Sequence, residues 1–262
     1  MRGGIYINNL YYNINAEDEK IKESLIELVD ALEEYDYLQF IEIPYLWKVY
    51  AESIGREIYN HYEIMAYVLE LKEEIERTSD NLYKNILKDY KRSKSSNKSW
   101  RLKEKLKEYE ESLNIVISDG NKTLKGFMEE KQIREVYKRL ILMYHPIVRK
   151  DKMELWGKIS KAYKDLDLET LEKIYFQGKD FRYESWLAID IEGYKKKFEK
   201  IIRGLKLSFP LVLKDEILDK EWREEISYNI CKNNMEFENE ARLLEEKLKC
   251  LEKELKEKQG LA

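Results

Sequence analysis

The stretch EEKQIREVYKRLILMYHPIVRKDKMELWGKISKAYKDLDLETLEKIY, residues 129–175, decides the fold. Its first half repeats apolar residues at helical spacing as far as His145 and Pro146. Pro146 is expected to stop that helix because proline cannot donate the next helical hydrogen bond. The second half renews the apolar spacing from Trp156 to Tyr163. The stretch therefore predicts two helices that pack antiparallel around a shared apolar interface.

These residues also resemble the J domain of DnaJ-type co-chaperones. The second helix of that family typically reads Ile, basic, any, Ala, Tyr, basic, basic, Leu, then four residues and His-Pro-Asp, and its third helix carries an aromatic residue, Ile, Ala-Tyr and Leu. The match covers about one-sixth of the chain. The matching residues are Ile133, Arg134, Val136, Tyr137, Lys138, Arg139, Leu140, Tyr144, His145 and Pro146 in the first half, and Trp156, Ile159, Ala162, Tyr163 and Leu166 in the second.

The chain departs from the family pattern at three places. Ile147 replaces the Asp of His-Pro-Asp, the residue that the resemblance links to stimulated ATP hydrolysis by a DnaK-type chaperone. The family's first helix, with its Tyr-any-any-Leu-Gly pattern, is missing upstream, and the Asp-Pro-any-any-Arg portion is absent downstream. An aliphatic side chain cannot replace a charge-assisted acceptor. The resemblance thus implies docking with weak or no ATPase stimulation.

The resemblance also implies a partner-binding surface, where a basic helix face would meet an acidic surface on the chaperone or on another protein. The alternative is an ordinary solvated helix face. Burial of Ile147 would favour structural drift, whereas its exposure beside the basic residues would favour a changed binding surface. The predicted site residues are Lys131, Arg134, Lys138, Arg139, His145, Pro146 and Ile147.

The N-terminal part is predicted to be a helical arm. Residues 5–14 are ambiguous between a strand and an extended arm, and Asn15 is a candidate cap for an amphipathic helix that runs to Leu32. Pro44 is expected to end that element or to start the next, a long helix over 47–75.

Three breaks are predicted after that helix. Residues 78–80 offer a break and a new cap, the polar run SKSSNKS at 93–99 indicates an exposed loop, and 119–121 have turn residues. Helical stripes lie between them, at 82–90 and 102–113.

Two heptad seams occupy the C-terminal part. One steps by four and three from Leu187 to Leu205, and the other does so from Phe237 to Leu255, with the turn residues Gly204, Ser208 and Pro210 after the first. This spacing suggests an antiparallel hairpin. Because each seam is short, the two are expected to pack on each other or on the N-terminal arm, with a homodimer through the C-terminal helix as the competing possibility.

The prediction is therefore an all-α, elongated chain with helical or coiled-coil arms. It divides into an N-terminal arm (1–120), the J-like segment (121–176) and a C-terminal hairpin or coiled coil (177–262).

Composition excludes several classes of function. Of the 262 residues, 48 are basic and 52 acidic, and a net charge of -4 provides no global basic field for nucleic acid. No apolar window is long enough to span a membrane, and the N-terminus does not match a signal peptide, so we expect a cytoplasmic protein without nucleic-acid or membrane partners. Two histidines and two widely spaced cysteines leave little material for a metal or catalytic site, and no cofactor motif is present.

Two hypotheses follow, both non-enzymatic. The first is a J-like co-chaperone or adaptor that docks a DnaK-type chaperone while its arms hold a client or a second subunit. The second is a structural or assembly protein that retains the J-like hairpin only as a packing module. An enzyme with an unrecognised carboxylate site is a minor third possibility.

Overall fold

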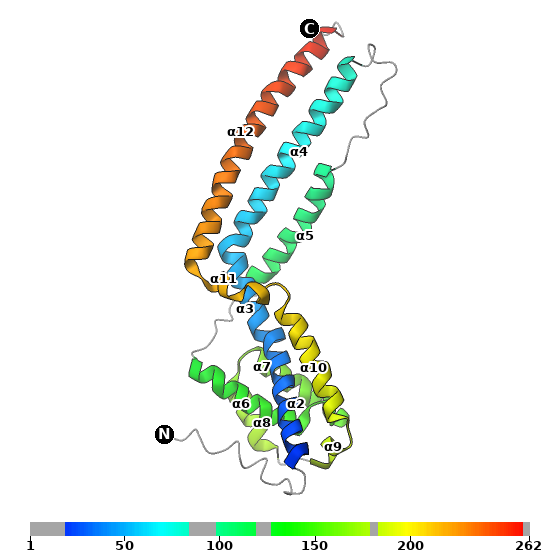
Figure 1. Ribbon diagram of the computed structural model, residues 1–262, viewed down its shortest axis with the longest axis vertical. Coiled ribbons are helices and arrows are strands. Elements are labelled where there is room, and N and C mark those ends of the chain that lie inside the picture. The colour runs from blue at the N-terminus through cyan, green and yellow to red at the C-terminus, as the bar shows by residue number, and fades with distance from the viewer. Residues whose placement is uncertain (1–18, 84–97, 119–126, 179–182, 259–262) are drawn as a thin grey trace. The chain divides into compact units, whose positions relative to one another are not determined.

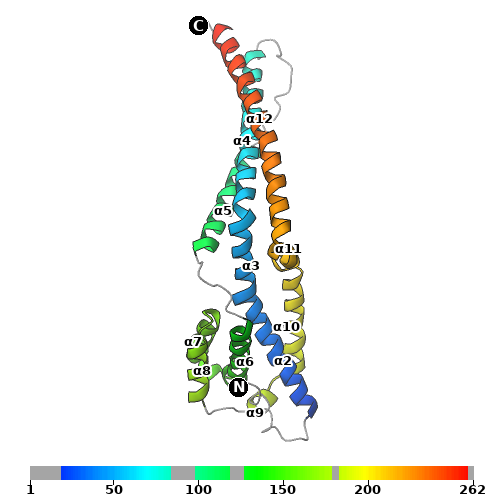
Figure 2. The ribbon, with the colours of Figure 1, turned by 90° about the vertical axis from the view of Figure 1, so that its left-hand side faces the viewer.

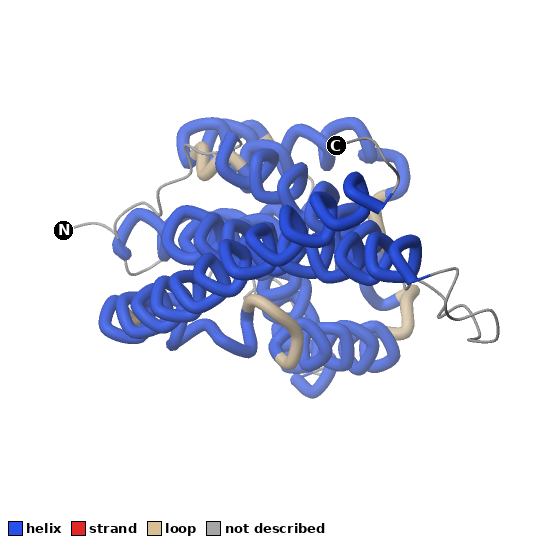
Figure 3. The backbone as a smooth tube through the Cα atoms, turned by 90° about the horizontal axis from the view of Figure 1, so that it is seen from above, coloured by secondary structure: helices blue, strands red, loops and turns tan. Residues whose placement is uncertain are grey.

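The computed structural model describes residues 19–83, 98–118, 127–178 and 183–258. Helices joined by turns make up these residues, and no strand occurs among them (Figure 3). The prediction of an all-α chain is confirmed. The predictions for 5–14, Asn15 and 119–121 lie outside the described residues.

The chain forms two compact units, each made of two separate segments. The first unit combines residues 1–47 with 121–214, and the second combines 48–120 with 215–262. This differs from the three consecutive segments predicted from the sequence. The difference arises because the described parts of the predicted N-terminal arm pack with two different later parts of the chain, α2 (Glu19–Tyr37) with α10 (Ile191–Lys206) and α4 (Arg56–Tyr83) with α12 (Lys220–Lys258).

The first unit is built around α2 (Glu19–Tyr37), which lies between α6 and α10. Ring and polar contacts pair Ser24 with Glu192 and Tyr35 with Phe198, so α2 and α10 run parallel. The other elements of this unit are α6 (Phe127–Tyr144), a 3-10 turn (Lys150–Lys152), α7 (Met153–Lys164), α8 (Leu168–Gln177), α9 (Tyr183–Leu187), α10 (Ile191–Lys206) and a 3-10 turn (Leu211–Leu213).

The core of the first unit joins α2 to the predicted hairpin. Fully buried residues of α2, α6, α7 and α8 form one cluster, to which α9 adds Trp186. The Trp186 indole N–H donates to the Leu142 carbonyl at 2.9 Å, which satisfies its polar atom inside the core. Asp167 caps α8 by accepting a hydrogen bond from the Thr170 amide at 3.0 Å.

The second unit consists mainly of α4 (Arg56–Tyr83), α5 (Lys98–Ser118) and α12 (Lys220–Lys258), with the short α11 (Lys214–Leu218) before α12. α4 lies between α12 and α5 (Figures 1 and 2). α12 runs parallel to α4, since His61 pairs with Asn234 and Tyr67 with Glu245 further along both helices. Val68 and Leu71 of α4 pack against Ala241, Leu244 and Leu248 of α12.

The two C-terminal seams therefore pack on the N-terminal part of the chain. The first seam packs through α10 on α2, and the second packs through α12 on α4. Within the first seam, Leu187 and Ile201 are exposed, whereas Ile202 is buried. A helix of 3.6 residues per turn drifts away from a strict heptad, and within α10 the neighbouring Ile202 is buried in place of Ile201.

The run from Glu19 to Tyr83 stays helical throughout, through two π-helical segments at Leu38–Glu42 and Ala51–Gly55 and the intervening α3 (Ile43–Tyr50). Pro44 is the second residue of α3, in its first turn, where a residue without an N–H donor is tolerated. Gly55 lies in the second π segment, where an added Cβ would stand 2.9 Å from Leu113 Cδ2 of α5. Its missing side chain permits this close approach.

One predicted break is wrong, and the described end of a predicted loop is helical instead. α4 continues through residues 78–80 as far as Tyr83, because these polar residues are partly or fully exposed and are compatible with a helix interior there. In the predicted loop 93–99, residues 93–97 are not described, while Lys98 and Ser99 begin α5 and Ser99 is buried.

Candidate functional site

The predicted binding surface lies on α6, which packs antiparallel to α7. Tyr137 stacks on Tyr163 with ring centroids 3.6 Å apart, and His145 meets the Trp156 ring edge-on at 4.8 Å. The contacting residue of α7 has a lower number where the contacting residue of the α6 side has a higher one. The two helices therefore form an antiparallel hairpin. The predicted pairing of these helices is therefore present.

α6 also packs antiparallel to α2, and this contact uses part of the predicted basic stripe. Arg134 donates from Nε and Nη2 to the two carboxylate oxygens of Glu33, at 2.7 and 2.8 Å. Lys138 pairs with Asp30 at 2.8 Å. The guanidinium of Arg134 also lies 4.1 Å from the centre of the Tyr37 ring. Two of the four predicted basic residues thus bind acids of their own chain.

The other predicted residues have different surroundings. Lys131 is exposed, whereas Arg139 is half-buried, with its guanidinium 5.3 Å from the centre of the Tyr175 ring and a buried Nε that has no hydrogen-bond partner. Pro146 is half-buried in the turn that follows α6. Of the seven predicted residues, Lys131 is exposed and the other six are partly buried.

The turn residues are held against the core. Burial lowers the pKa of His145 to about 4, and its Nδ1 accepts a 3.3 Å hydrogen bond from the Ile147 amide. The Ile147 side chain is partly buried and packs on the core cluster of the first unit. Ile147 is thus neither fully buried nor fully exposed.

Behind the hairpin lies a buried polar network that the sequence analysis missed. Glu33 is 1% exposed and accepts a 2.6 Å hydrogen bond from the Tyr163 hydroxyl in addition to those from Arg134. Asp36 is 9% exposed and accepts a 2.8 Å hydrogen bond from Tyr137. Glu33 lies one helical turn after the apolar Val29, and Asp36 lies one turn after the apolar Leu32. A carboxylate at an apolar position of an amphipathic helix is the sequence signal that could have revealed both.

The pKa directions in this network follow from burial and charge. Burial raises the pKa of Asp36 to about 6, with repulsion from Glu33 adding to the effect and the Tyr137 hydrogen bond opposing it. Burial and the Glu33 charge raise the pKa of Tyr163, so its hydroxyl stays protonated as a donor. Burial opposes the charge of Arg134, but its hydrogen bonds to Glu33 outweigh this and raise its pKa.

The hydrogen bonds of this network connect helices of the first unit. The Glu33 carboxylate joins α2 to both α6 and α7, through Arg134 and Tyr163. No group of three or more potential metal ligands occurs among the described residues. Within the same residues, no helix is long and apolar enough to cross a membrane.

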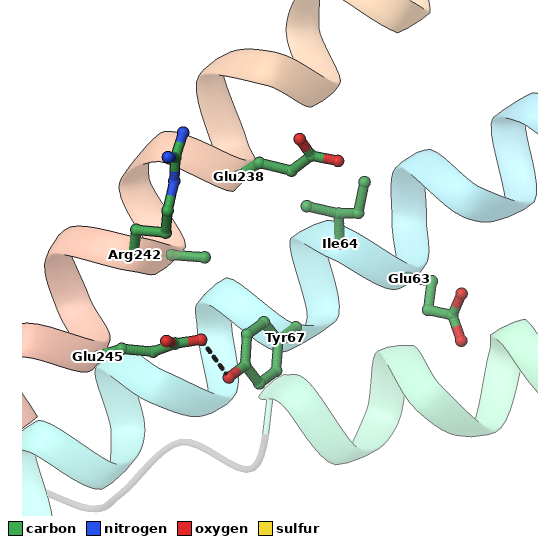
Figure 4. Close-up of a pocket in the computed structure, with 7 residues that line it drawn as sticks. Glu63, Ile64, Tyr67, Glu238, Arg242 and Glu245 are labelled. Atoms are coloured by element: carbon green, nitrogen blue, oxygen red, sulfur yellow. Dashed lines mark hydrogen bonds between the residues drawn. The ribbon is translucent and has the colours of Figure 1, made fainter.

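A second candidate place is a hollow between α4 and α12 in the second unit (Figure 4). Tyr67 donates to Glu245 at 2.7 Å, and this hydrogen bond raises the pKa of the tyrosine. Three carboxylates and one arginine form most of the polar lining, and no histidine or cysteine contributes. The lining residues are Glu63, Ile64, Tyr67, Glu238, Ala241, Arg242 and Glu245.

Comparison of the chain with known protein families, with curated proteins and with solved structures finds no match.

Proposed function

We propose that this protein is a non-enzymatic helical assembly protein in which the J-like hairpin is an internal packing module. The observation that supports the proposal is the use of Arg134 and Lys138 in ion pairs with α2. A partner that approached this face of α6 would have to compete with acids already in place. The hairpin then serves to hold α2, which continues as one helical run into the second unit.

The energetics favour the internal role. Glu33 is almost fully buried, so withdrawal of Arg134 toward a partner would leave an uncompensated buried charge. Breaking one side of a buried pair typically costs about 3–5 kcal/mol. Exposed charge pairs with a partner typically contribute only about 0.2–1 kcal/mol each, which does not offset that cost.

The test is single-turnover ATP hydrolysis by a DnaK-type chaperone, with the parent protein and with its Ile147→Asp variant. The scaffold proposal expects neither protein to bind the chaperone or to accelerate hydrolysis. Acceleration by the variant alone would overturn it and support docking by a J-like surface that the missing carboxylate silences. Urea unfolding of both proteins would establish that the variant is folded.

A J-like adaptor remains the second candidate, favoured by the antiparallel α6–α7 pairing around a His145–Pro146 turn. Its partner would be a DnaK-type chaperone or another acidic surface, bound through the exposed Lys131 and the turn. If Ile147→Asp stimulates hydrolysis, adding Lys131→Glu should reduce the stimulation. A matched charge reversal of the exposed Lys158 on α7 should not.

A further inference from the structure

α12 has two different faces along its 39 residues. Phe237, Ala241 and Leu244 face α4 and belong to the core of the second unit. On the opposite face, Tyr228, Met235 and Leu243 are 70%, 61% and 68% exposed. An apolar stripe on the outer side of a long helix is typical of a surface that receives another helix.

Charged residues on this outer face are arranged symmetrically about Asn239. Lys232 and Glu246 lie seven residues to either side of it, within about 20° of its direction around the helix. Glu225 and Lys253 lie fourteen residues to either side, within about 40°. All five residues are exposed.

The apolar residues of the outer face follow the same symmetry. Met235 and Leu243 lie four residues to either side of Asn239, within about 40° of its direction. Tyr228 and Cys250 lie eleven residues to either side, within about 20°. Each of these apolar or sulfur-containing side chains thus has a counterpart the same number of residues away on the other side of Asn239.

We infer that the outer face of α12 binds the same face of a second copy of this chain, antiparallel, with the two-fold axis at Asn239. In a two-fold interface, residue i meets residue j and residue j meets residue i. Lys232 then lies beside Glu246 of the other copy, and Met235 lies near Leu243. Parallel pairing would instead place Lys232 on Lys232 and Glu246 on Glu246, which is repulsive.

This inference rests on the proposed assembly function, for which it names the partner. The inference concerns the second unit, whereas the chaperone assay tests the function of the hairpin in the first unit. Stimulated ATP hydrolysis would therefore overturn the proposed function and leave the α12 interface standing. A parent protein that does not self-associate would overturn the interface and leave the internal role of the hairpin standing.

The two native cysteines report the orientation directly. Cys231 and Cys250 are both exposed, and they lie about 28 Å apart along one helix, too far for a short cross-linker to join them within a chain. In the antiparallel pair, Cys231 of one copy lies close to Cys250 of the other. Treatment of the full chain with bismaleimidoethane should give a covalent dimer whose digested peptides contain the Cys231–Cys250 link. Links of Cys231 to Cys231 and of Cys250 to Cys250 would overturn the antiparallel interface.

Charge exchange tests the register. Lys232→Glu and Glu246→Lys should each weaken the dimer about three- to tenfold in analytical ultracentrifugation, because each occurs twice across the two-fold axis. The double variant should return the affinity to within about twofold of the parent, because the opposite charges again face each other. The reversal Glu252→Lys, exposed but outside the stripe, should leave self-association unchanged. A parent that stays monomeric, or a double variant no better than the single ones, would overturn the proposal. Circular dichroism would check that each variant remains helical.

Discussion

At the scale of single residues, Glu33 determines how the first unit is held together. It lies on α2, yet its carboxylate accepts hydrogen bonds from Arg134 of α6 and Tyr163 of α7. A buried carboxylate is tolerated only when such partners satisfy it. The Glu33 carboxylate thus links three helices, and an arrangement that lost these partners would leave its charge unpaired.

We expect Arg134→Gln to lower the free energy of unfolding by about 2–4 kcal/mol, because the Glu33 charge loses its counterion inside the core. Lys131→Gln removes a positive charge from an exposed position of the same helix and should change stability by less than about 0.5 kcal/mol. Urea denaturation followed by circular dichroism would measure both. Equal effects of the two substitutions would mean that the Arg134–Glu33 pair contributes nothing beyond net charge.

The sequence predicted the hairpin residues better than their roles. Tyr137, Ile159 and Tyr163 belong to the apolar pattern that predicted two packed helices, and all three are buried. The predicted basic surface is only partly exposed, because this face of α6 packs on a helix other than α7. Its actual neighbour α2 lies about 100 residues away in sequence, and single-helix periodicity contains no information on a partner at that distance.

At the scale of elements, α4 supplies the cap for α5. Lys98 and Ser99 donate their backbone N–H groups to the Glu73 carboxylate at 2.9 and 3.3 Å, and the Ser99 hydroxyl donates at 2.7 Å. Burial opposes ionisation of Glu73, but these hydrogen bonds outweigh it and lower its pKa. A negative charge at a helix N-terminus is also favoured by the helix dipole.

Glu73→Gln should destabilise the start of α5, because a neutral amide is a weaker acceptor for the unpaired N–H groups. Hydrogen exchange of the amides in 98–106 should accelerate, with a loss of about 0.5–2 kcal/mol in local stability. Glu74→Gln, the adjacent exposed carboxylate, is the matched control and should leave these amides unchanged. Unchanged exchange in both variants would show that the Glu73 cap has no energetic role.

Periodicity located most helices but not their boundaries or neighbours. The stripes of α4, α5 and α12 were predicted because apolar spacing alone identifies an amphipathic helix. The break expected at 78–80 was wrong because polar cap residues are compatible with the exposed end of a longer helix. The π segments beside Pro44 and Gly55 were not predicted, since they depend on contacts such as that of Gly55 with α5.

At the scale of the whole molecule, stability against acid combines groups with opposite behaviour. Burial raises the pKa of Asp36 from 3.8 to about 6, and it lowers the pKa of His145 from 6.5 to about 4. Between pH 4 and 6, the folded state holds the Asp36 proton more tightly than the unfolded state, so this contribution falls as pH rises. Over nearly the same range, the unfolded state binds the His145 proton more tightly, so its contribution rises with pH.

The two contributions nearly cancel in the parent, and single variants should separate them. Asp36→Asn removes the contribution that decreases as pH rises. The free energy of unfolding of this variant, relative to that of the parent, should therefore increase by about 2–3 kcal/mol from pH 4 to pH 7. His145→Gln removes the contribution that increases as pH rises. The free energy of unfolding of this variant, relative to that of the parent, should therefore decrease from pH 4 to pH 7. Urea unfolding at several pH values would measure both slopes, and the double variant should again follow the parent. Parallel profiles for all four proteins would show that neither group titrates differently in the folded and unfolded states, and that acid sensitivity resides in the many exposed carboxylates instead.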